Sequence, residues 1–384
     1  MIPLSRFVLA AVLAVLMVLG ATTTYIYLGS RQSRVAEPPK KPTDTTPAPR
    51  AFRLPGTLYL VQSGAVYTLS GGRFRLVRSD GGWTQPSAYP DGSELLIVKK
   101  TALFSDVYEM DPNGVLLRQL TVNEAAPSRY PDIGDNHWSF YPRLSPDGQT
   151  LWMTYDGLKC SGCYDVSLAV WSMPMNGSIR QAKAWTDGGY YTGGDVQPIP
   201  LPQGGVIYTK YDYASNIDYH LESKLVGMLW FTNRANSRGR MLTDPTSDCR
   251  SPALSPDGTQ VAMICTYEKQ VSYLTLASWN GSTLGALRTL VTDHLVAQPT
   301  WAPDGSGIAY LAPGVASGQF QLWFLPKAAY TAPPPTPTPR PTPGGPHNGP
   351  LPSPSPTPAP PPVRPIQITQ FSGFDATSTM AWLD

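Results

Sequence analysis

The sequence predicts an all-β protein in which six four-stranded sheets close radially into a six-bladed β-propeller, preceded by one N-terminal transmembrane helix. Three observations lead to the propeller prediction. A Pro-Asp-Gly turn recurs along the chain, its copies are spaced by about the length of one four-stranded sheet, and the carboxyl end resembles the strand before each turn.

The repeated turn joins two strands of each sheet. A typical copy is Gln85–Val98 (QPSAYPDGSELLIV), in which a proline, the turn and an apolar strand follow one another. Proline presets φ, aspartate bonds to nearby backbone and glycine accepts positive φ, so the motif favours a tight turn. The glycines that end the copies, one of them degenerate, are Gly92, Gly148, Gly204, Gly258 and Gly305. Their intervals of 56, 56, 54 and 47 residues fit one propeller blade with its loops.

The two ends of the repeat region complete the sixth blade. Gly56–Val77 supplies three short strands but lacks the strand that precedes the turn elsewhere. Thr377–Asp384 aligns with that missing strand and places Trp382 at the position of Trp301. We therefore expect the N- and C-terminal strands to pair and close the ring, which removes exposed sheet edges.

This pattern resembles the WD40-like (PD40) repeat of TolB-type β-propellers, over about residues 56–384 apart from one insertion. The resemblance implies the six-bladed fold. It implies no particular function, because propellers serve many roles. TolB itself also carries an N-terminal α/β domain, whereas here we expect only an anchor and a tether before the propeller. The role of TolB is therefore not carried over.

Residues 1–30 hold the predicted membrane anchor. Phe7–Leu28 is a run of 22 residues without a charge, which as a helix spans ~33 Å, enough to cross the hydrocarbon core. A signal peptide cleaved near Gly20 is the alternative. By a count of positive charges, the basic residues after this run would keep the rest of the chain on the inner side of the membrane. Since a short N-terminal anchor usually exports the chain behind it, we expect a single-pass protein of the cell membrane with an extracytoplasmic propeller, or a secreted protein after cleavage.

Two proline-rich segments border the predicted domain. Residues 31–55 form a linker, extended because proline favours the polyproline II conformation. Residues 327–365, rich in Pro, Thr and Ser, are expected to be a disordered insertion in the last full blade, because strand-like residues resume at 366. The propeller is thus assigned to residues 56–384. The insertion is either a solvated spacer or a ligand for an SH3-type domain.

The four cysteines suggest two pairs. Cys249 and Cys265 each lie eight residues from Asp257 at the centre of a turn, so they should face each other and form a disulfide; two buried thiols are the alternative. Cys160 and Cys163 form a CxxC in a loop. A disulfide that staples the loop, free thiols, and a redox or metal pair all remain open there.

The predicted binding residues gather on the face opposite the Pro-Asp-Gly turns, where the long loops lie. The residue before each inner-strand proline should ring the channel mouth with amides and hydroxyls: Gln85, Tyr141, Gln197, Ser251, Gln298 and the equivalent Thr379. Such a ring either holds a peptide or sugar, or bonds neighbouring blades and water. A second candidate is an outer loop suited to a protein interface, or simply exposed, with Tyr211, Tyr213, Tyr219 and His220.

The sequence favours a non-catalytic module that binds a protein or peptide as a monomeric propeller. The 29 Lys and Arg nearly balance the 27 Asp and Glu, which argues against nucleic-acid binding. Four scattered His and the lack of nucleophile-elbow, zinc-peptidase or phosphate-loop motifs predict no catalytic residue, no metal and no cofactor. The alternatives are a carbohydrate or cell-wall binder, and a propeller hydrolase or lyase that would use His137 or His220.

Overall fold

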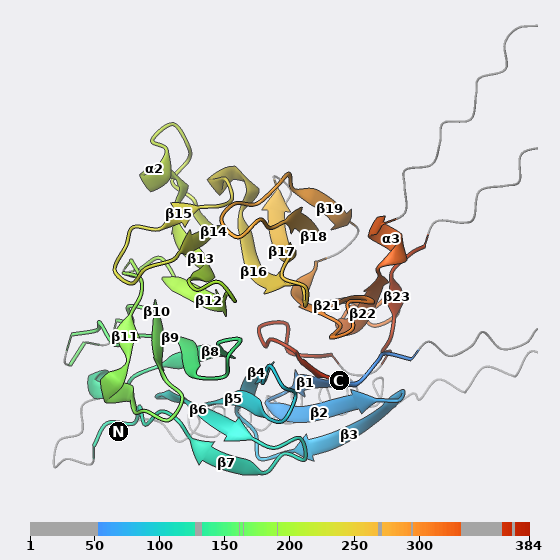
Figure 1. Ribbon diagram of the computed structural model, residues 1–384, viewed down its shortest axis with the longest axis horizontal. Coiled ribbons are helices and arrows are strands. Elements are labelled where there is room, and N and C mark those ends of the chain that lie inside the picture. Colours follow the sequence, from blue (N-terminus) through green and yellow to red (C-terminus); the bar gives the residue numbers. More distant parts are fainter. Residues whose placement is uncertain are drawn as a thin grey trace, which may run out of the picture. The chain divides into compact units, whose positions relative to one another are not determined.

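Six antiparallel sheets of four strands each are arranged around a central axis in the computed structural model of the chain (Figure 1). The structure describes residues 53–126, 133–160, 162–163, 165–189, 191–267, 271–292, 295–331, 363–370 and 373–384. The predicted all-β six-bladed propeller is confirmed. Within the described ranges, no helix is both long and apolar enough to cross a membrane. The anchor predicted at residues 1–30, most of the linker at 31–55 and most of the insertion at 327–365 lie outside the described residues.

Each blade is given from its inner to its outer strand. Blade 1 is β24 (Ala381–Leu383), β1 (Thr57–Gln62), β2 (Ala65–Ser70) and β3 (Arg73–Arg78); blade 2 is β4 (Trp83–Ala88), β5 (Leu95–Lys100), β6 (Ser105–Met110) and β7 (Leu116–Gln119); blade 3 is β8 (Ser139–Leu144), β9 (Thr150–Tyr155), β10 (Ala169–Pro174) and β11 (Lys183–Ala184). Blade 4 is β12 (Asp195–Pro200), β13 (Val206–Tyr213), β14 (Leu225–Thr232) and β15 (Arg240–Met241); blade 5 is β16 (Cys249–Leu254), β17 (Gln260–Tyr267), β18 (Val271–Ser278) and β19 (Arg288–Val291); blade 6 is β20 (Ala297–Trp301), β21 (Gly307–Pro313), β22 (Phe320–Pro326) and β23 (Ile366–Gln367). The short helices are η1 (Ile133–Asp135), η2 (Ile179–Gln181), η3 (Pro245–Ser247), α2 (Ala214–Ile217) and α3 (Ala328–Thr331).

Hydrophobic clusters lie between neighbouring blades all the way around the ring. Leu58 and Phe324 share the cluster between blades 1 and 6, and Val98 and Met153 share the one between blades 2 and 3. Because each sheet is covered on both faces, its second strand is apolar along its length rather than alternating. Leu95–Val98 in β5 is entirely buried for this reason.

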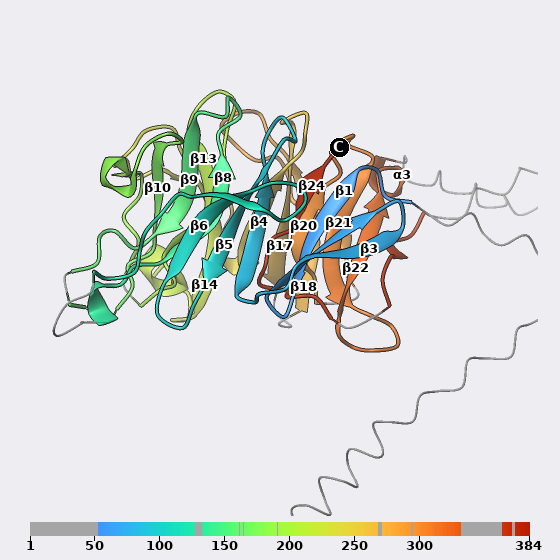
Figure 2. The ribbon, with the colours of Figure 1, turned by 90° about the horizontal axis from the view of Figure 1, so that it is seen from below.

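The ring is closed by strand β24, which pairs antiparallel with β1 as predicted (Figure 2). Trp382 lies opposite Leu58 in this pairing, as Trp301 lies opposite Ile308 in blade 6. The Trp382 indole is 6% exposed, and its N–H donates to the Pro55 carbonyl at 2.7 Å. The tail is therefore held both by its backbone and by a buried aromatic side chain.

A bulge interrupts the inner strands of blades 2 to 6, at the residue before the recurring proline of each repeat. At these bulges the ladder skips two residues, for example between Thr84 and Ser87. The residue before the proline has φ between 50° and 57° in every case: Gln85, Tyr141, Gln197, Ser251 and Gln298. None of them is glycine, and a left-handed conformation costs an L-residue roughly 1–2 kcal/mol. Contacts elsewhere must therefore hold the bulges in place.

A threonine that follows the outer strand of four blades bonds back to the third strand. Thr121 Oγ1 accepts the backbone N–H of Val107 at 2.9 Å, and Thr243 Oγ1 accepts that of Leu229 at 2.9 Å. Equivalent bonds in blades 3 and 6 join Thr186 to Val170 and Thr369 to Leu322. The hydroxyl thus satisfies a third-strand N–H where the short fourth strand has ended.

Replacing Trp382 with alanine should loosen the closure of the ring. Losing a buried tryptophan and its hydrogen bond to Pro55 should lower the free energy of unfolding by about 3–5 kcal/mol. Urea denaturation followed by circular dichroism measures this effect. The exposed Val315→Ala serves as control and should change the free energy of unfolding by less than about 0.5 kcal/mol. A Trp382→Ala protein as stable as the parent would show that the tail does not seal the ring.

Candidate functional site

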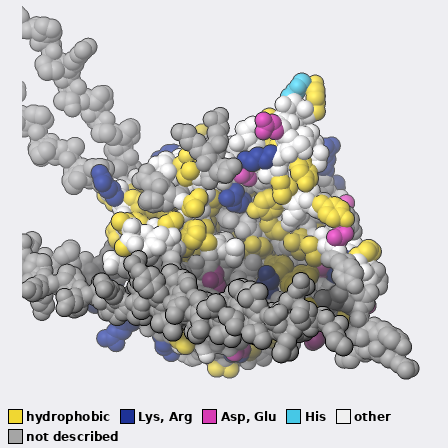
Figure 3. All heavy atoms as spheres, turned by 180° about the vertical axis from the view of Figure 1, so that it is seen from behind, with side chains coloured by type: hydrophobic (Ala, Val, Ile, Leu, Met, Phe, Trp, Pro, Cys, Tyr) yellow, Lys and Arg dark blue, Asp and Glu magenta, His cyan; other side chains and the backbone are white. Residues whose placement is uncertain are grey.

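The propeller has two distinct faces, which its strands connect (Figure 2). The turns between first and second strands, which carry the Pro-Asp-Gly motif, lie on the same face as the turns between third and fourth strands. This face is called the PDG face. The loops from second to third strand and from blade to blade lie on the other, the loop face, which Figure 3 shows. The described residues before β1 and on both sides of the insertion reach the PDG face, since they adjoin Gly56 and the turn from β22 to β23.

Five of the six predicted ring residues line a narrow space in the central channel. The space between them is about 10 Å³, room for about one water molecule. It is lined by Tyr141, Gln197, Ser251, Gln298 and Thr379 with neighbouring strand residues, while Gln85 lines the wider space on the loop-face side. The ring thus narrows the channel and separates its two ends.

The ring side chains bond from one blade to the next. Gln85 Oε1 accepts the backbone N–H of Tyr141 at 2.7 Å, and Gln197 Oε1 accepts that of Ser251 at 2.9 Å. Gln85 N in turn donates to Ser378 Oγ at 2.7 Å. In each case the N–H belongs to a residue at or beside the bulge, where the strand ladder offers it no partner.

Other side chains of the ring donate hydrogen bonds to neighbouring blades and to the C-terminal segment. Gln197 Nε2 donates to Ser251 Oγ at 3.0 Å, Gln298 Nε2 donates to the Ala376 carbonyl at 3.1 Å, and Thr379 Oγ1 donates to the Pro86 carbonyl at 2.9 Å. Burial raises the pKa of Tyr141 to about 12, against the opposing effect of its hydrogen bond with Gln197. These bonds match the alternative in which the ring joins neighbouring blades.

The loop-face end of the channel widens into a cavity of about 590 Å³. Its walls carry large aromatic side chains together with one cation, Lys100, and one carboxylate, Asp375. The lining comprises Gly82, Trp83, Thr84, Gln85, Lys100, Thr101, Phe140, Tyr141, Leu168, Gly193, Val196, Tyr211, Asp375 and Thr377. Asp375 accepts the backbone N–H groups of Ser63 and Gly64, at 3.0 and 3.2 Å. No hydrogen bond or ion pair joins the Lys100 side-chain nitrogen to any described residue, so this cation is available to a ligand.

The residues of the predicted tyrosine loop lie partly in strand β13 and partly in the connection from β13 to β14. Tyr211 belongs to the strand and faces the cavity, where burial raises its pKa. Tyr219 lies beyond α2 and is 81% exposed, with its ring centroid 3.8 Å from that of His220. Tyr213 is 36% exposed. Of the four predicted residues, only Tyr211 is therefore brought to the cavity.

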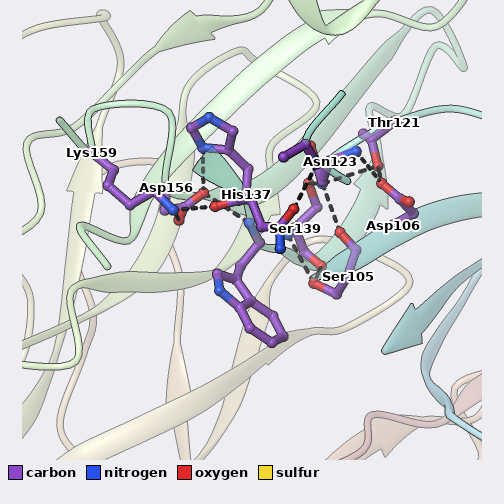
Figure 4. A network of polar contacts seen from close by, with 11 residues as sticks. Ser105, Asp106, Thr121, Asn123, His137, Ser139, Asp156 and Lys159 are labelled. Atoms are coloured by element: carbon purple, nitrogen blue, oxygen red, sulfur yellow. Dashed lines mark hydrogen bonds and ion pairs between the residues drawn. The ribbon is translucent and has the colours of Figure 1, made fainter. Parts of the chain in front are cut away.

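His137 forms part of a polar network between blades 2 and 3 (Figure 4). Its Nδ1 lies 3.1 Å from Asp156 Oδ1, and the ammonium of Lys159 lies 3.6 Å from Asp156 Oδ2. The Asp156 side chain is fully buried and also accepts the N–H of Trp138 at 2.8 Å. A histidine oriented by a carboxylate recurs in hydrolases, but only with a nucleophile beside the other ring nitrogen.

The serine hydroxyls of this network have other partners. Ser105 Oγ donates to the Ser139 carbonyl at 2.8 Å, and Asn123 Nδ2 donates to Ser139 Oγ at 2.7 Å (Figure 4). Beside them, Asp106 accepts bonds from Thr121 and Asn123. The network therefore ties two blades together, and no serine hydroxyl contacts His137 among the described residues.

The histidines do not converge on a metal site in the described part of the chain. His137 and His220 belong to different loops, and no group of three His, Cys, Asp or Glu side chains there could hold a metal ion. His294 and His347 lie outside the described residues.

Both cysteine pairs are disulfides in the structure. Cys249 and Cys265 are directly opposite in β16 and β17, with Cα atoms 4.0 Å apart. Cys160 and Cys163 close a short loop after β9, with Cα atoms 5.4 Å apart. The first bridge lies in the core between blades 4 and 5, and the second is on the loop face beside Lys159.

Sequence reasoning found Tyr141 and Tyr211 but missed Trp83 and Phe140 in the aromatic wall of the cavity, and it missed Arg143. Arg143 lies two residues after the ring position of β8 and lines the channel between the ring and the PDG face. Side chains two apart on a strand point to the same side, so an alignment of the repeats on their ring residues would have marked it as an inward-facing charge.

Replacing Gln197 with alanine tests whether the ring residues join the blades. The change leaves the Ser251 N–H and the Thr209 hydroxyl, which donates to Gln197 at 3.0 Å, without partners in a buried place. We expect the free energy of unfolding to fall by about 1–3 kcal/mol in urea denaturation. Gln203→Ala, at an exposed glutamine, is the control and should have little effect. Equal stability of both variants would refute an inter-blade role for Gln197.

Comparison with solved structures identifies the architecture. TolB from Acinetobacter baumannii superimposes with a TM-score of 0.53 at 16% identity, over 72% of this chain and 62% of that chain. TolB from Agrobacterium tumefaciens gives a TM-score of 0.47 at 14% identity, over 71% and 85%, and a puromycin hydrolase gives 0.43 at 19% identity, over 66% and 38%. No protein-family model matches the chain, and no curated protein matches it in sequence. The predicted resemblance is confirmed at the level of structure: the chain has the fold of a TolB-like six-bladed β-propeller.

Proposed function

We propose that this chain is a membrane-tethered, extracytoplasmic propeller that binds a protein or peptide without catalysing a reaction. The observation that carries the proposal is the cavity of about 590 Å³ on the loop face. Its volume lies within the range of ordinary ligand pockets, and it combines aromatic walls with a few polar groups that can orient a ligand. Hydrophobic side chains are also spread around the visible part of this face (Figure 3).

The cavity suits one extended segment better than a large flat partner. Tyr141, Tyr211 and Phe140 offer apolar area with little conformational freedom to lose, and tyrosine is frequent at binding hot spots. Lys100, free of partners among the described residues, would attract an acidic group. Since the ring narrows the channel to about 10 Å³, a segment would enter the cavity and leave on the same face.

The attachment points of the linker and the insertion relative to the cavity support the proposed membrane tether. The described residues that adjoin the linker and the insertion lie at the PDG face, opposite the cavity. A tether attached at one face would leave the other free for a partner. Two disulfides also favour an oxidising compartment.

The proposed location has a direct test. Intact mass spectrometry of the membrane fraction from expressing cells should find the chain with residues 1–30 still attached, resistant to carbonate extraction, and external protease should digest the propeller. A released protein that begins near Ala21 would contradict the membrane anchor and support a cleaved signal peptide instead.

Binding is tested by selecting peptides from a displayed library against the full chain in detergent. We expect Tyr211→Ala to weaken the selected peptides at least about tenfold, because it removes an aromatic wall of the cavity. Tyr213→Ala changes an exposed tyrosine two residues away on the same strand and should leave the affinity unchanged. Calorimetric titration measures both.

Four outcomes would count against this assignment. Failure to select any peptide from the library contradicts a peptide-binding cavity. Peptides that ignore Tyr211 but require Tyr219 would move the site to the exposed loop. Binding on a glycan array would favour the carbohydrate alternative, because aromatic walls also stack on sugar rings. Turnover of a peptide that is lost in His137→Ala would favour the hydrolase alternative.

A further inference from the structure

A second set of inward-facing residues lies between the ring and the PDG face. Each member comes two positions after a ring residue: Ser87, Arg143, Ile199, Ala253, Thr300 and Ala381. They border a cavity of about 280 Å³ that opens toward the PDG face. Arg143 is the one charged side chain in this described lining, and it also borders the narrow ring beyond.

The surroundings of Arg143 offer its guanidinium no counter-charge. No hydrogen bond or ion pair engages this side chain within the described ranges, and no carboxylate lines the cavity there. The walls are largely apolar, with Trp301, Trp382 and Met380 among them. Both indole N–H groups are already bonded, to the Ala253 and Pro55 carbonyls.

The charge on Arg143 persists in this setting. Burial lowers its pKa to about 10, which still leaves the guanidinium protonated at neutral pH. The side chain is partly exposed to the channel, and an anionic ligand would supply there the counter-charge that the described part of the protein does not. Arginine presents a planar fork of donors that matches the two oxygens of a carboxylate.

We propose that the PDG-face end of the channel binds the terminal carboxylate of a peptide, with Arg143 as its charged partner. The ring closes the channel behind Arg143 to about 10 Å³, so a ligand must enter end-on and cannot thread through. The end of a chain meets this requirement. The tryptophan, proline and methionine walls then accommodate the apolar side chains of its last residues.

Charge matching favours a carboxylate over a phosphate. One guanidinium neutralises one negative charge, whereas a phosphate dianion would retain an uncompensated charge inside an apolar cavity. This site is separate from the loop-face cavity, and neither proposal depends on the other.

The experiment uses the full chain in detergent and two matched probe libraries. The first contains N-acetylated tripeptides with a free carboxyl terminus, and the second contains the same tripeptides as terminal amides. Bound members are identified by affinity selection and mass spectrometry, and their affinities are measured by calorimetry. We expect free-acid members to bind and their amides to bind about 10- to 100-fold more weakly, the range for a hydrogen bond to a charged group.

Three variants separate binding from folding. Arg143→Met should abolish the preference for the free acid while leaving the ligand-free melting temperature equal or higher, because it removes a charge that has no partner among the described residues. Arg143→Lys should retain part of the preference, since the charge remains but the fork is lost. Arg180→Met, at an exposed arginine in η2 on the same face, is the control and should bind as the parent does.

Several results would overturn the proposal. Equal binding of acids and amides would remove the carboxylate from recognition. Inorganic phosphate or acetate alone binding as tightly as the best tripeptide would show a simple anion site. A melting temperature that drops sharply in Arg143→Met would make Arg143 a structural residue. Loss of tripeptide binding in Tyr211→Ala would place the ligand on the opposite face.

Discussion

Hydrogen bonds that join bulges of the inner strands to the preceding blade are the constraint on which the rest of this propeller depends. Five residues before prolines adopt a left-handed conformation that their side chains disfavour. The bulge releases an N–H from the ladder, and the preceding blade supplies an acceptor, as Gln85 does for Tyr141 and Gln197 does for Ser251. In blades 2, 3 and 5 a local irregularity thus becomes the means by which the blade is joined to the one before it at the axis.

The same constraint divides the channel into two chemically different ends. Because the ring side chains meet at the axis, a space of about 590 Å³ on one side is separated from about 280 Å³ on the other. The larger space carries aromatic rings and Lys100 near the long loops. The smaller one presents Arg143 among apolar walls. A single closure therefore creates two places at which different ligands could be recognised.

Much of the fold could be predicted because turn chemistry repeats in the sequence. Pro-Asp-Gly marks the turn from first to second strand, and the position of Trp382 relative to Trp301 already indicated which strand the tail would complete. The candidate functional site was harder to predict from the sequence than the fold. A residue before proline gives no local sign of positive φ, so whether Gln197 faces a ligand or the next blade depends on a bulge that the pattern does not reveal. Tyr211 and Tyr219 are close in sequence, yet the length of the β13–β14 hairpin separates them.

The pairing of β24 with β1 also affects how the protein folds. The bond from Trp382 to Pro55 spans 327 positions of the chain, whereas the disulfide from Cys249 to Cys265 spans only 16. Contacts between remote segments form slowly, because the intervening chain must first become ordered. The lateral edges of the first and last blades consequently stay open until late in folding, when they can pair with other chains. Assembly of this molecule is therefore most vulnerable to misassociation in the interval before its ends meet.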